Sequence, residues 1–163
     1  MKILFTLISL VVVLNSAFAQ QSESASESLI IAGKGWGKVS IGADRRTVES
    51  VIGSGENRSR FDDVYFLDYP AKGIQVSYNN SDNTLHTVYF YNGQRRYENF
   101  APFQGRTNKG VDWKSSPGDV IKVYGKPKED NEGPGWGWRR LVFEGIDFRF
   151  ENGTMVRIGI PGK

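Results

Sequence analysis

The chain has 163 residues, no cysteine and a formal net charge of +3. A sequence without cysteine cannot form disulfides, a catalytic thiol, a thiolate metal site or a lipid-modified amino-terminal Cys. The near balance of 21 basic and 18 acidic residues, without a long Lys/Arg run, argues against a nucleic-acid-binding protein.

Residues 1–19 have the pattern of a secretory signal peptide. Lys2 supplies the basic start, residues 3–14 form an apolar run, and the AFA at residues 17–19 fits a small-x-small cleavage site. This run of about twelve residues is too short to cross the roughly 30 Å hydrocarbon core as a helix, which disfavours the alternative of a retained membrane anchor. We expect cleavage near Ala19, export to the periplasm or the medium, and no membrane span in the mature protein.

Residues 20–28, QQSESASES, are polar and of low complexity. Such a segment cannot bury enough apolar surface to offset its ordering entropy, so it is predicted to be a disordered tether.

The remainder is predicted to be a tandem duplication, with repeat 1 at residues 29–91, a connector at 92–108 and repeat 2 at 109–163. A shift of 72 residues aligns the two copies without a gap until the loop NNSDN, which is two residues longer than its counterpart ENG. The best matches are Val39 with Val111, Val48 with Val120, Gly53 with Gly125, Gly73 with Gly145, Ile74 with Ile146 and Tyr78 with Phe150.

Each copy is expected to begin with a short helix, at residues 44–52 and 117–124. Ser116 is a predicted N-cap, Pro117 suits the first helical position, and Gly53 and Gly125 are expected to end the helices in the αL conformation. Three strands should follow, near 64–70, 73–78 and 84–91, matched by 136–143, 145–150 and 154–160. The predicted fold class is α+β, with two helix-plus-antiparallel-sheet repeats. The two repeats are expected to pack as one unit, because a unit of about sixty residues is only marginally stable alone.

Alternation along the strands divides the side chains between two faces. The predicted core face holds Ile74, Val76, Tyr78, Val88, Phe90, Ile146, Phe148, Phe150, Ile158 and Ile160. Val64, Phe66, Trp136 and Trp138 are assigned to the same face, the alternative for the two tryptophans being an aromatic binding platform. His86, the only histidine, is expected at the core edge with one satisfied hydrogen bond rather than as a ligand or base.

The opposite, open face is the predicted binding surface. It is rich in tyrosine in the first copy and in arginine in the second, and both residue types carry much of the binding energy in protein interfaces. Alternatively, this face packs one half against the other, or its tyrosines only stabilise the sheet. The candidate contact residues are Tyr65, Tyr69, Tyr89, Tyr91, Arg139, Arg149 and Arg157.

Motifs for nucleophilic catalysis, phosphate binding and zinc-dependent hydrolysis are absent from the sequence. The acidic clusters around Asp62 and Asp63, and around Asp130, are read as solvated loop charges rather than as an acid–base pair or a calcium site. We therefore expect a non-enzymatic protein without a metal or other cofactor.

The segments VSIGADRRTVESVIGSG and VDWKSSPGDVIKVYGKP resemble the strand–helix–Gly signature of a bacterial envelope superfamily. It includes the SmpA/OmlA-type outer-membrane assembly lipoproteins and the tandem-repeat β-lactamase inhibitory protein. The resemblance covers about a third of the chain, and it implies two α/β repeats whose open, concave sheet surface binds another protein. The anchoring Cys of the lipoproteins and the disulfides of the inhibitory protein are absent, so β-lactamase inhibition is not implied.

The sequence thus predicts an exported protein-binding module whose partner is an envelope or extracellular protein. The first alternative is a carbohydrate or peptidoglycan binder that uses the same tyrosines as stacking platforms. The second is a carboxylate-dependent hydrolase, which needs two titratable groups that converge in a pocket.

Overall fold

The computed structural model describes residues 28–94, 99–133 and 137–162. The predicted signal peptide and residues 20–27 of the predicted tether lie outside these ranges. The described residues form two α-helices of eight residues each and are otherwise dominated by strands in two sheets. The predicted fold class of two helix-plus-sheet repeats is therefore wrong, because the chain is mainly β and its larger sheet runs unbroken through both halves.

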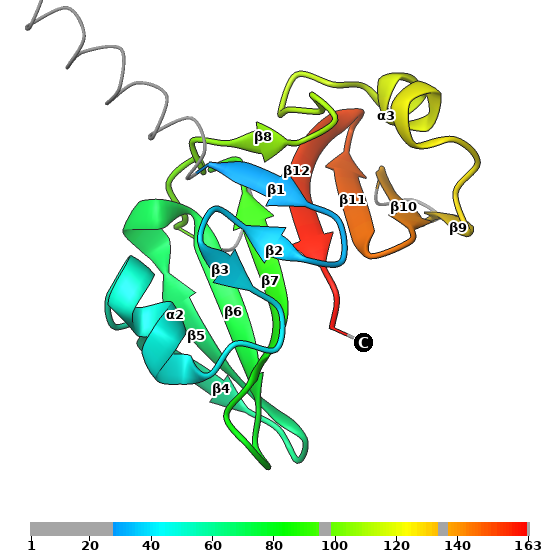
Figure 1. Cartoon of the computed structure of the whole chain (residues 1–163). Helices are drawn as coiled ribbons and strands as arrows, with labels where there is room; N and C mark the ends of the chain where they lie inside the picture. The colour runs from blue at the N-terminus through cyan, green and yellow to red at the C-terminus, as the bar shows by residue number, and fades with distance from the viewer. Residues whose placement is uncertain (1–27, 95–98, 134–136, 163) are drawn as a thin grey trace, which may run out of the picture.

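The larger sheet has eight strands in the order β4-β5-β6-β7-β12-β11-β10-β9 (Figure 1). Their bounds are β4 (Glu56–Arg60), β5 (Val64–Tyr69), β6 (Ile74–Asn79), β7 (Leu85–Tyr91), β9 (Glu129–Glu132), β10 (Trp138–Phe143), β11 (Ile146–Glu151) and β12 (Thr154–Ile160). All of its pairings are antiparallel, and a short 3-10 helix, η1 (Pro70–Lys72), connects β5 to β6. The central pairing of β7 with β12 joins the two halves, for example through Phe90 and Ile158.

A smaller sheet in the order β3-β2-β1-β8 lies over the central strands of the larger one (Figure 1). Its strands are β1 (Leu29–Ile31), β2 (Gly35–Trp36), β3 (Val39–Ser40) and β8 (Arg106–Thr107). The β1–β2 turn touches the β10–β11 turn, where the Gly33 N–H donates to the Gly145 carbonyl oxygen at 2.7 Å. A Cβ on Gly145 would lie 2.5 Å from the Gly33 nitrogen, so this contact between distant parts of the chain requires glycine.

The helices are α2 (Arg45–Ile52) and α3 (Pro117–Tyr124). The structure confirms the predicted N-cap of α3, where Ser116 and Asp119 form a capping box, and it makes Asp44 the N-cap of α2. Gly53 has φ 82° and ψ −176°, so the glycine ends the helix at positive φ but not in the predicted αL conformation. Within the described ranges, no helix has the length and apolarity that crossing a membrane requires.

The helices and the small sheet cover one side of the large sheet, which is its core face (Figure 1). The core residues predicted on β6, β7, β11 and β12 are buried there, and Val48 and Val120 attach the helices to them. These buried residues belong to a single cluster that includes both halves of the chain.

The predicted faces of β5 and β10 are wrong. Tyr65, Leu67 and Tyr69 pair in register with Tyr78, Val76 and Ile74, so they share the core face and are at most 8 % exposed. In β10 the pairing of Leu141 with Phe148 turns Arg139 to the core side and leaves Trp138 on the open face. Trp136 lies outside the described residues.

Candidate functional site

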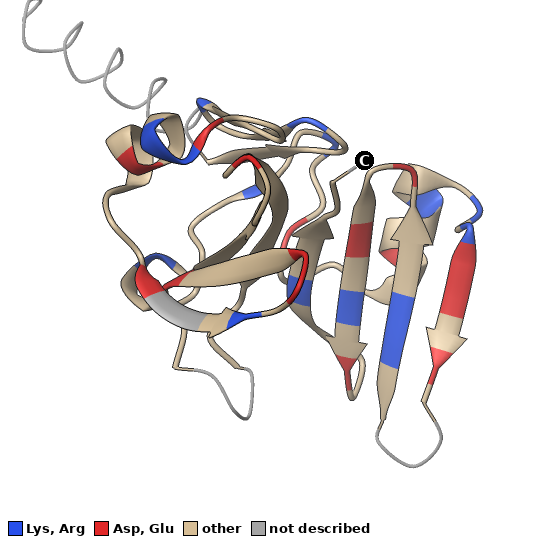
Figure 2. Ribbon diagram, turned by 90° about the horizontal axis from the view of Figure 1, so that it is seen from below, with Lys and Arg blue, Asp and Glu red and all other residues tan. Residues whose placement is uncertain are grey.

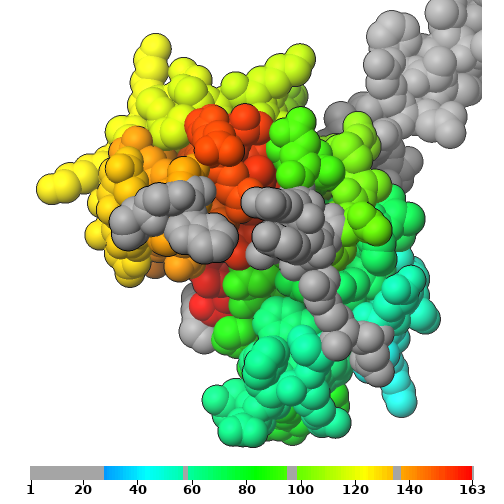
Figure 3. Space-filling view, turned by 180° about the vertical axis from the view of Figure 1, so that it is seen from behind, coloured from blue at the N-terminus to red at the C-terminus, as the bar shows by residue number. Residues whose placement is uncertain are grey.

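The open face of the large sheet, turned away from the helices and the small sheet, holds the candidate site. Three arginines on β12, β11 and β10 lie side by side because Arg149 pairs with both Arg157 and Arg140. We call Arg140, Arg149 and Arg157 the arginine row. Figure 2 shows basic bands at one level across these neighbouring strands, with acidic bands beside them. Figure 3 views the molecule from this side, where the side chains of β11 and β12 meet those of β7 at the surface.

Asp147 supplies a buried counter-charge to two members of the row. It is only 2 % exposed, and its carboxylate accepts hydrogen bonds from Arg157 Nη2 at 3.1 Å and Arg140 Nη2 at 3.2 Å. Burial alone would lower the pKa of Arg140, but the hydrogen bond and charge of Asp147 outweigh it and the pKa is raised. Arg140 is therefore held in its charged form, and the hydrogen bonds to Asp147 hold both guanidinium groups in position.

Aromatic rings support two of the arginines from the sheet surface. The Arg157 guanidinium carbon lies 4.3 Å from the centroid of the Tyr89 ring, and that of Arg149 lies 5.1 Å from the Trp138 ring. Cation–π contacts of this kind are typically worth about 0.5–1 kcal/mol at exposed sites. Arg149 also lies 3.5 Å from Glu151 Oε1. The row is thus a preorganised group of guanidinium ions and not a set of mobile surface side chains.

Exposure differs along the row. The side chains of Arg140, Arg149 and Arg157 are 38 %, 28 % and 12 % exposed. A partner would therefore reach Arg140 and Arg149 directly, while Arg157 is mainly a support for the buried carboxylate of Asp147.

Tyr91 is on the open face but is not available for contact. It is 1 % exposed, stacks on Phe100 with ring centroids 4.4 Å apart, and donates its hydroxyl to Gln75 Oε1 at 3.1 Å. Gln75 in turn donates to Asp68 Oδ1 at 2.8 Å. This chain of hydrogen bonds fills the surface beside the row and explains how polar residues are buried on β5 and β6.

The structure brings together three of the seven predicted contact residues, Tyr89, Arg149 and Arg157. The predicted exposure of Tyr91 is wrong because Phe100 covers it, and Tyr65 and Tyr69 are wrongly placed because they belong to the core. Arg139 is on the core side of the sheet at its edge, where it forms a two-pronged ion pair with Asp130 at 2.8 and 2.7 Å.

Sequence reasoning missed Arg140, Asp147 and Trp138 as members of this site. Arg140 and Trp138 share a face in alternation, so both were lost with the wrong face of β10. Asp147 shares the open face with Arg149 by alternation, but only the structure reveals that it is buried between two arginines.

The acidic clusters do not form a converging pocket. Asp62 and Asp63 are exposed in the loop that follows β4, while Asp130 is on β9, at the opposite edge of the sheet. The described residues contain no group of three or more His, Cys, Asp or Glu side chains placed to hold a metal ion. His86 is half-buried, with Nδ1 2.9 Å from Thr87 Oγ1, as expected for a histidine with one hydrogen bond at the core edge.

No protein-family model matches this sequence, and no curated protein matches it. The fold is similar to the crystal structure of a DUF4309 family protein, YjgB, from Bacillus subtilis, with a TM-score of 0.52. The two chains are 12 % identical, and the match covers 80 % of this chain and 88 % of YjgB. At this identity the likeness concerns the sheet-rich fold alone. It does not bear on the resemblance to the envelope superfamily.

Proposed function

We propose that this protein is an exported, non-enzymatic binding module that recognises an envelope or extracellular protein through the arginine row and Trp138. The observation that carries the proposal is the alignment of Arg140, Arg149 and Arg157 on three adjacent strands, fixed by Asp147 and by two aromatic rings. Arginine and tryptophan are the residue types most often found at the energetic centre of protein interfaces. The signal-like residues 1–19 support export, either to the periplasm or to the medium.

Preorganisation favours this surface as a binding site. An arginine that is already held by a carboxylate or a ring loses little side-chain entropy when a partner binds, whereas a mobile side chain loses about 0.5–1.5 kcal/mol. Arg140 is oriented by Asp147, and Arg149 by Trp138. Both guanidinium groups can then receive a partner's side chains without a large ordering cost.

The exposed guanidinium groups indicate the chemistry of the partner. Three carboxylates lie near the three arginines: Asp147 and Glu151 form ion pairs with the row, and the charge of Glu129 acts on Arg140. The row is therefore close to charge balance, and what it offers a partner is its partly exposed N–H donors. Guanidinium groups bind carboxylates in a planar, two-pronged geometry. We therefore expect the partner to present Asp or Glu side chains to the row.

The carbohydrate alternative rests on fewer residues than the sequence suggested. Sugar stacking needs exposed aromatic faces, but Tyr65, Tyr69 and Tyr91 are buried and the Tyr89 ring is occupied by Arg157. Glycan arrays with the purified protein separate the two functions, because a binder specific for proteins leaves them blank.

The deciding experiment is a crosslinked pull-down from the native envelope fraction with residues 20–163 as bait, followed by affinity measurements on the captured protein. We expect Arg149→Ala combined with Trp138→Ala to weaken binding by about 2 kcal/mol or more, as for two interface hot spots. Arg139→Ala is the matched control, since Arg139 is on the same strand but on the other side of the sheet. Equal affinity of the wild type and the double variant would exclude the arginine row as the binding surface.

A further inference from the structure

Phe61, in the turn between β4 and β5, is the most exposed of the large apolar residues that the structure describes. It is 61 % exposed, and its ring meets the Phe66 ring edge-on, with centroids 5.9 Å apart. A phenyl ring in water forgoes the favourable free energy of burial, and aromatic side chains are enriched where one protein contacts another. The turn is therefore suited to anchor a second molecule.

Asn80 holds this turn in one conformation. Its side-chain amide donates to the carbonyl oxygens of Phe61 at 2.6 Å and Asp62 at 2.8 Å, and its backbone N–H donates to that of Asp63 at 2.9 Å. The Phe61 N–H donates across the turn to the Val64 carbonyl oxygen at 2.8 Å. Because the backbone is already ordered, burial of the ring by a second molecule requires little further loss of entropy.

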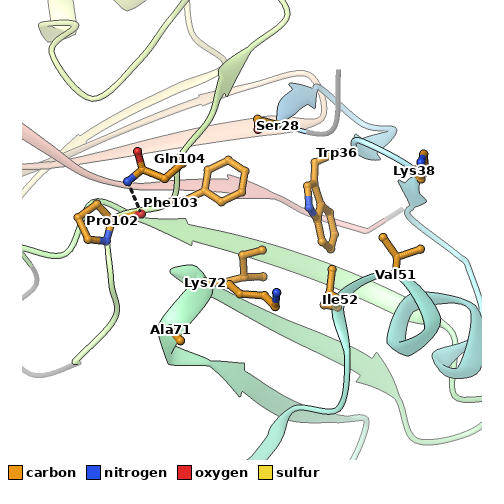
Figure 4. Close-up of a pocket in the computed structure, with 11 residues that line it drawn as sticks. Ser28, Trp36, Lys38, Val51, Ile52, Ala71, Lys72, Pro102, Phe103 and Gln104 are labelled. Atoms are coloured by element: carbon orange, nitrogen blue, oxygen red, sulfur yellow. Dashed lines mark hydrogen bonds between the residues drawn. The ribbon is translucent and has the colours of Figure 1, made fainter. Parts of the chain in front are cut away.

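A cavity of about 300 Å³ lies on the other side of the large sheet from the arginine row, between the small sheet, the end of α2, η1 and the segment before β8 (Figure 4). Its floor consists of Trp36, Ile52, Ile74 and Phe103, each less than 9 % exposed. Trp36 and Phe103 both pack on the buried Phe90 ring, with centroids 5.4 and 4.6 Å away. The floor is thus apolar, aromatic and fixed by the core.

The cavity has the size and the chemistry to receive a phenyl ring. An apolar cavity of about 150 Å³ is large enough to hold benzene, and this one is larger. Its mouth is apolar too, since Val51, Ala71 and Pro102 line it and are exposed. A ring that entered would therefore be buried against apolar atoms at the floor and at the mouth.

Phe61 does not reach the cavity of its own molecule. Phe61 precedes β5 and η1 follows it, so the turn and the cavity lie at opposite ends of this strand. The six residues of β5 span roughly 20 Å, at about 3.3 Å per residue. Only a second copy of the chain can bring this ring into this cavity.

We propose that the protein self-associates, with the Phe61 ring of one copy seated in the cavity of a second copy. The charges next to the ring and next to the cavity are complementary, because the exposed carboxylates of Asp62 and Asp63 adjoin the ring and the exposed Lys72 borders the cavity. The two surfaces differ, so each contact joins unlike parts of the two copies. One ring and its surroundings form a small interface, and such interfaces are weak and transient.

Self-association does not depend on the arginine row. The row lies on the open side of β10, β11 and β12, whereas the Phe61 turn adjoins β4, at the far edge of the sheet, and the cavity is on the core side. Arg149→Ala combined with Trp138→Ala should therefore leave self-association unchanged. Failure of this proposal and failure of the proposed function are distinguishable in this way.

Sedimentation equilibrium at protein concentrations up to about 1 mM, where even a weak complex is populated, measures the association. Phe61→Ser should weaken it about tenfold or more, and so should Ala71→Trp, which fills the cavity from an exposed position. Lys72→Glu should weaken it by about two- to fivefold, the effect of an exposed charge. Val123→Ser is the matched control: it removes an exposed apolar side chain from α3, outside both surfaces, and should associate like the wild type.

A mixture of two variants decides whether the ring and the cavity meet. Phe61→Ser keeps the cavity and Ala71→Trp keeps the ring, so together they should form a complex of one molecule of each, although neither self-associates. In isotope-labelled Phe61→Ser, addition of unlabelled Ala71→Trp should shift the NMR methyl signals of Val51 and Ile52. A monomeric wild type, a Phe61→Ser variant that associates like the wild type, or a mixture without the complex would each overturn the proposal.

Discussion

Asp147 and Gly159 face each other across the β11–β12 ladder, and the glycine provides the space that the buried carboxylate occupies. A Cβ at residue 159 would lie 2.5 Å from Asp147 Oδ2 and 3.1 Å from Tyr89 Cε1. The absence of a side chain on β12 thus permits an aspartate, two arginines and a tyrosine to pack together on one face of the sheet.

Gly159→Ala should destabilise the protein by about 1–3 kcal/mol, because the added methyl group overpacks the site and displaces the carboxylate from its arginines. Urea unfolding measures the change. Gly118→Ala serves as the control: Gly118 is inside α3, and a Cβ there would meet only Ser116 Oγ, at 3.7 Å. Alanine at that helical position should leave stability unchanged or raise it by up to about 1 kcal/mol.

Asp147→Asn should lower the free energy of unfolding by about 2 kcal/mol or more, because two guanidinium groups lose the charge that offsets their desolvation. Arg157, 12 % exposed, bears most of that cost. Chemical denaturation of the single variants and of Asp147→Asn with Arg157→Met gives the coupling between the two residues. Additive effects of the two substitutions would contradict a direct ion pair.

Tyr91→Phe should separate stability from binding. Its hydroxyl donates to Gln75 in a buried setting, so its removal should cost about 1 kcal/mol of stability. Partner binding should stay at the wild-type level, since Tyr91 is covered by Phe100. The two measurements are thermal unfolding and the affinity for the captured partner. Weaker binding by the variant would show that Tyr91 contacts the partner after all.

The N-terminal cap of α3 predicts how the free energy of unfolding depends on pH. Hydrogen bonds from Ser116, through its hydroxyl and backbone N–H, lower the pKa of Asp119 below its ordinary value of 3.8. Because the folded-state pKa is the lower one, this contribution to stability is complete above the unfolded-state value and is lost as the pH falls through the folded-state pKa. Asp119→Asn should be less stable than the wild type at neutral pH, and the difference should shrink below about pH 3.8. Urea midpoints of both proteins across this range check the prediction, and a constant difference would exclude the carboxylate as its source.

The helices and most strands of the large sheet were predictable because their signals are local. Ser116, Pro117 and Asp119 mark the start of α3 in sequence as they do in the structure. The third-strand prediction for the second half, residues 154–160, coincides with β12. These elements could be predicted because their signals, helix-capping residues and the alternation of apolar and polar residues, lie within a few residues of one another in the sequence.

The faces of β5 and β10 were not predictable from alternation alone. In β5 both sets of alternate residues contain large apolar side chains, so the pattern does not choose between them. A sharper signal was present in β10: the two-residue connection Glu144–Gly145 sets Phe143 directly opposite Ile146 and so on the same face. Because Ile146 is a core residue, this turn places Phe143 on the core face, and alternation along β10 then places Arg140 on the open face.

The small sheet and the outermost strands escaped prediction for a different reason. β2, β3 and β8 have two residues each, too few to show a periodic pattern. β1 pairs with β8, which lies far away in the sequence, and a local sequence pattern does not predict such a pairing. β9 has the sequence EDNE, and all four of its residues are exposed, without the alternation of apolar and polar residues that identifies a strand.

That unusual composition of β9 also limits how far the large sheet can extend. An open sheet edge offers unpaired backbone groups to any other strand, and proteins often guard such edges with charge. Glu129, Asp130 and Glu132 lie on the terminal strand, and at the other end of the sheet β4 has Glu56 and Arg60. Charges of like sign on β9 repel a second copy of the same edge and so disfavour extension of the sheet by pairing of β9 with β9.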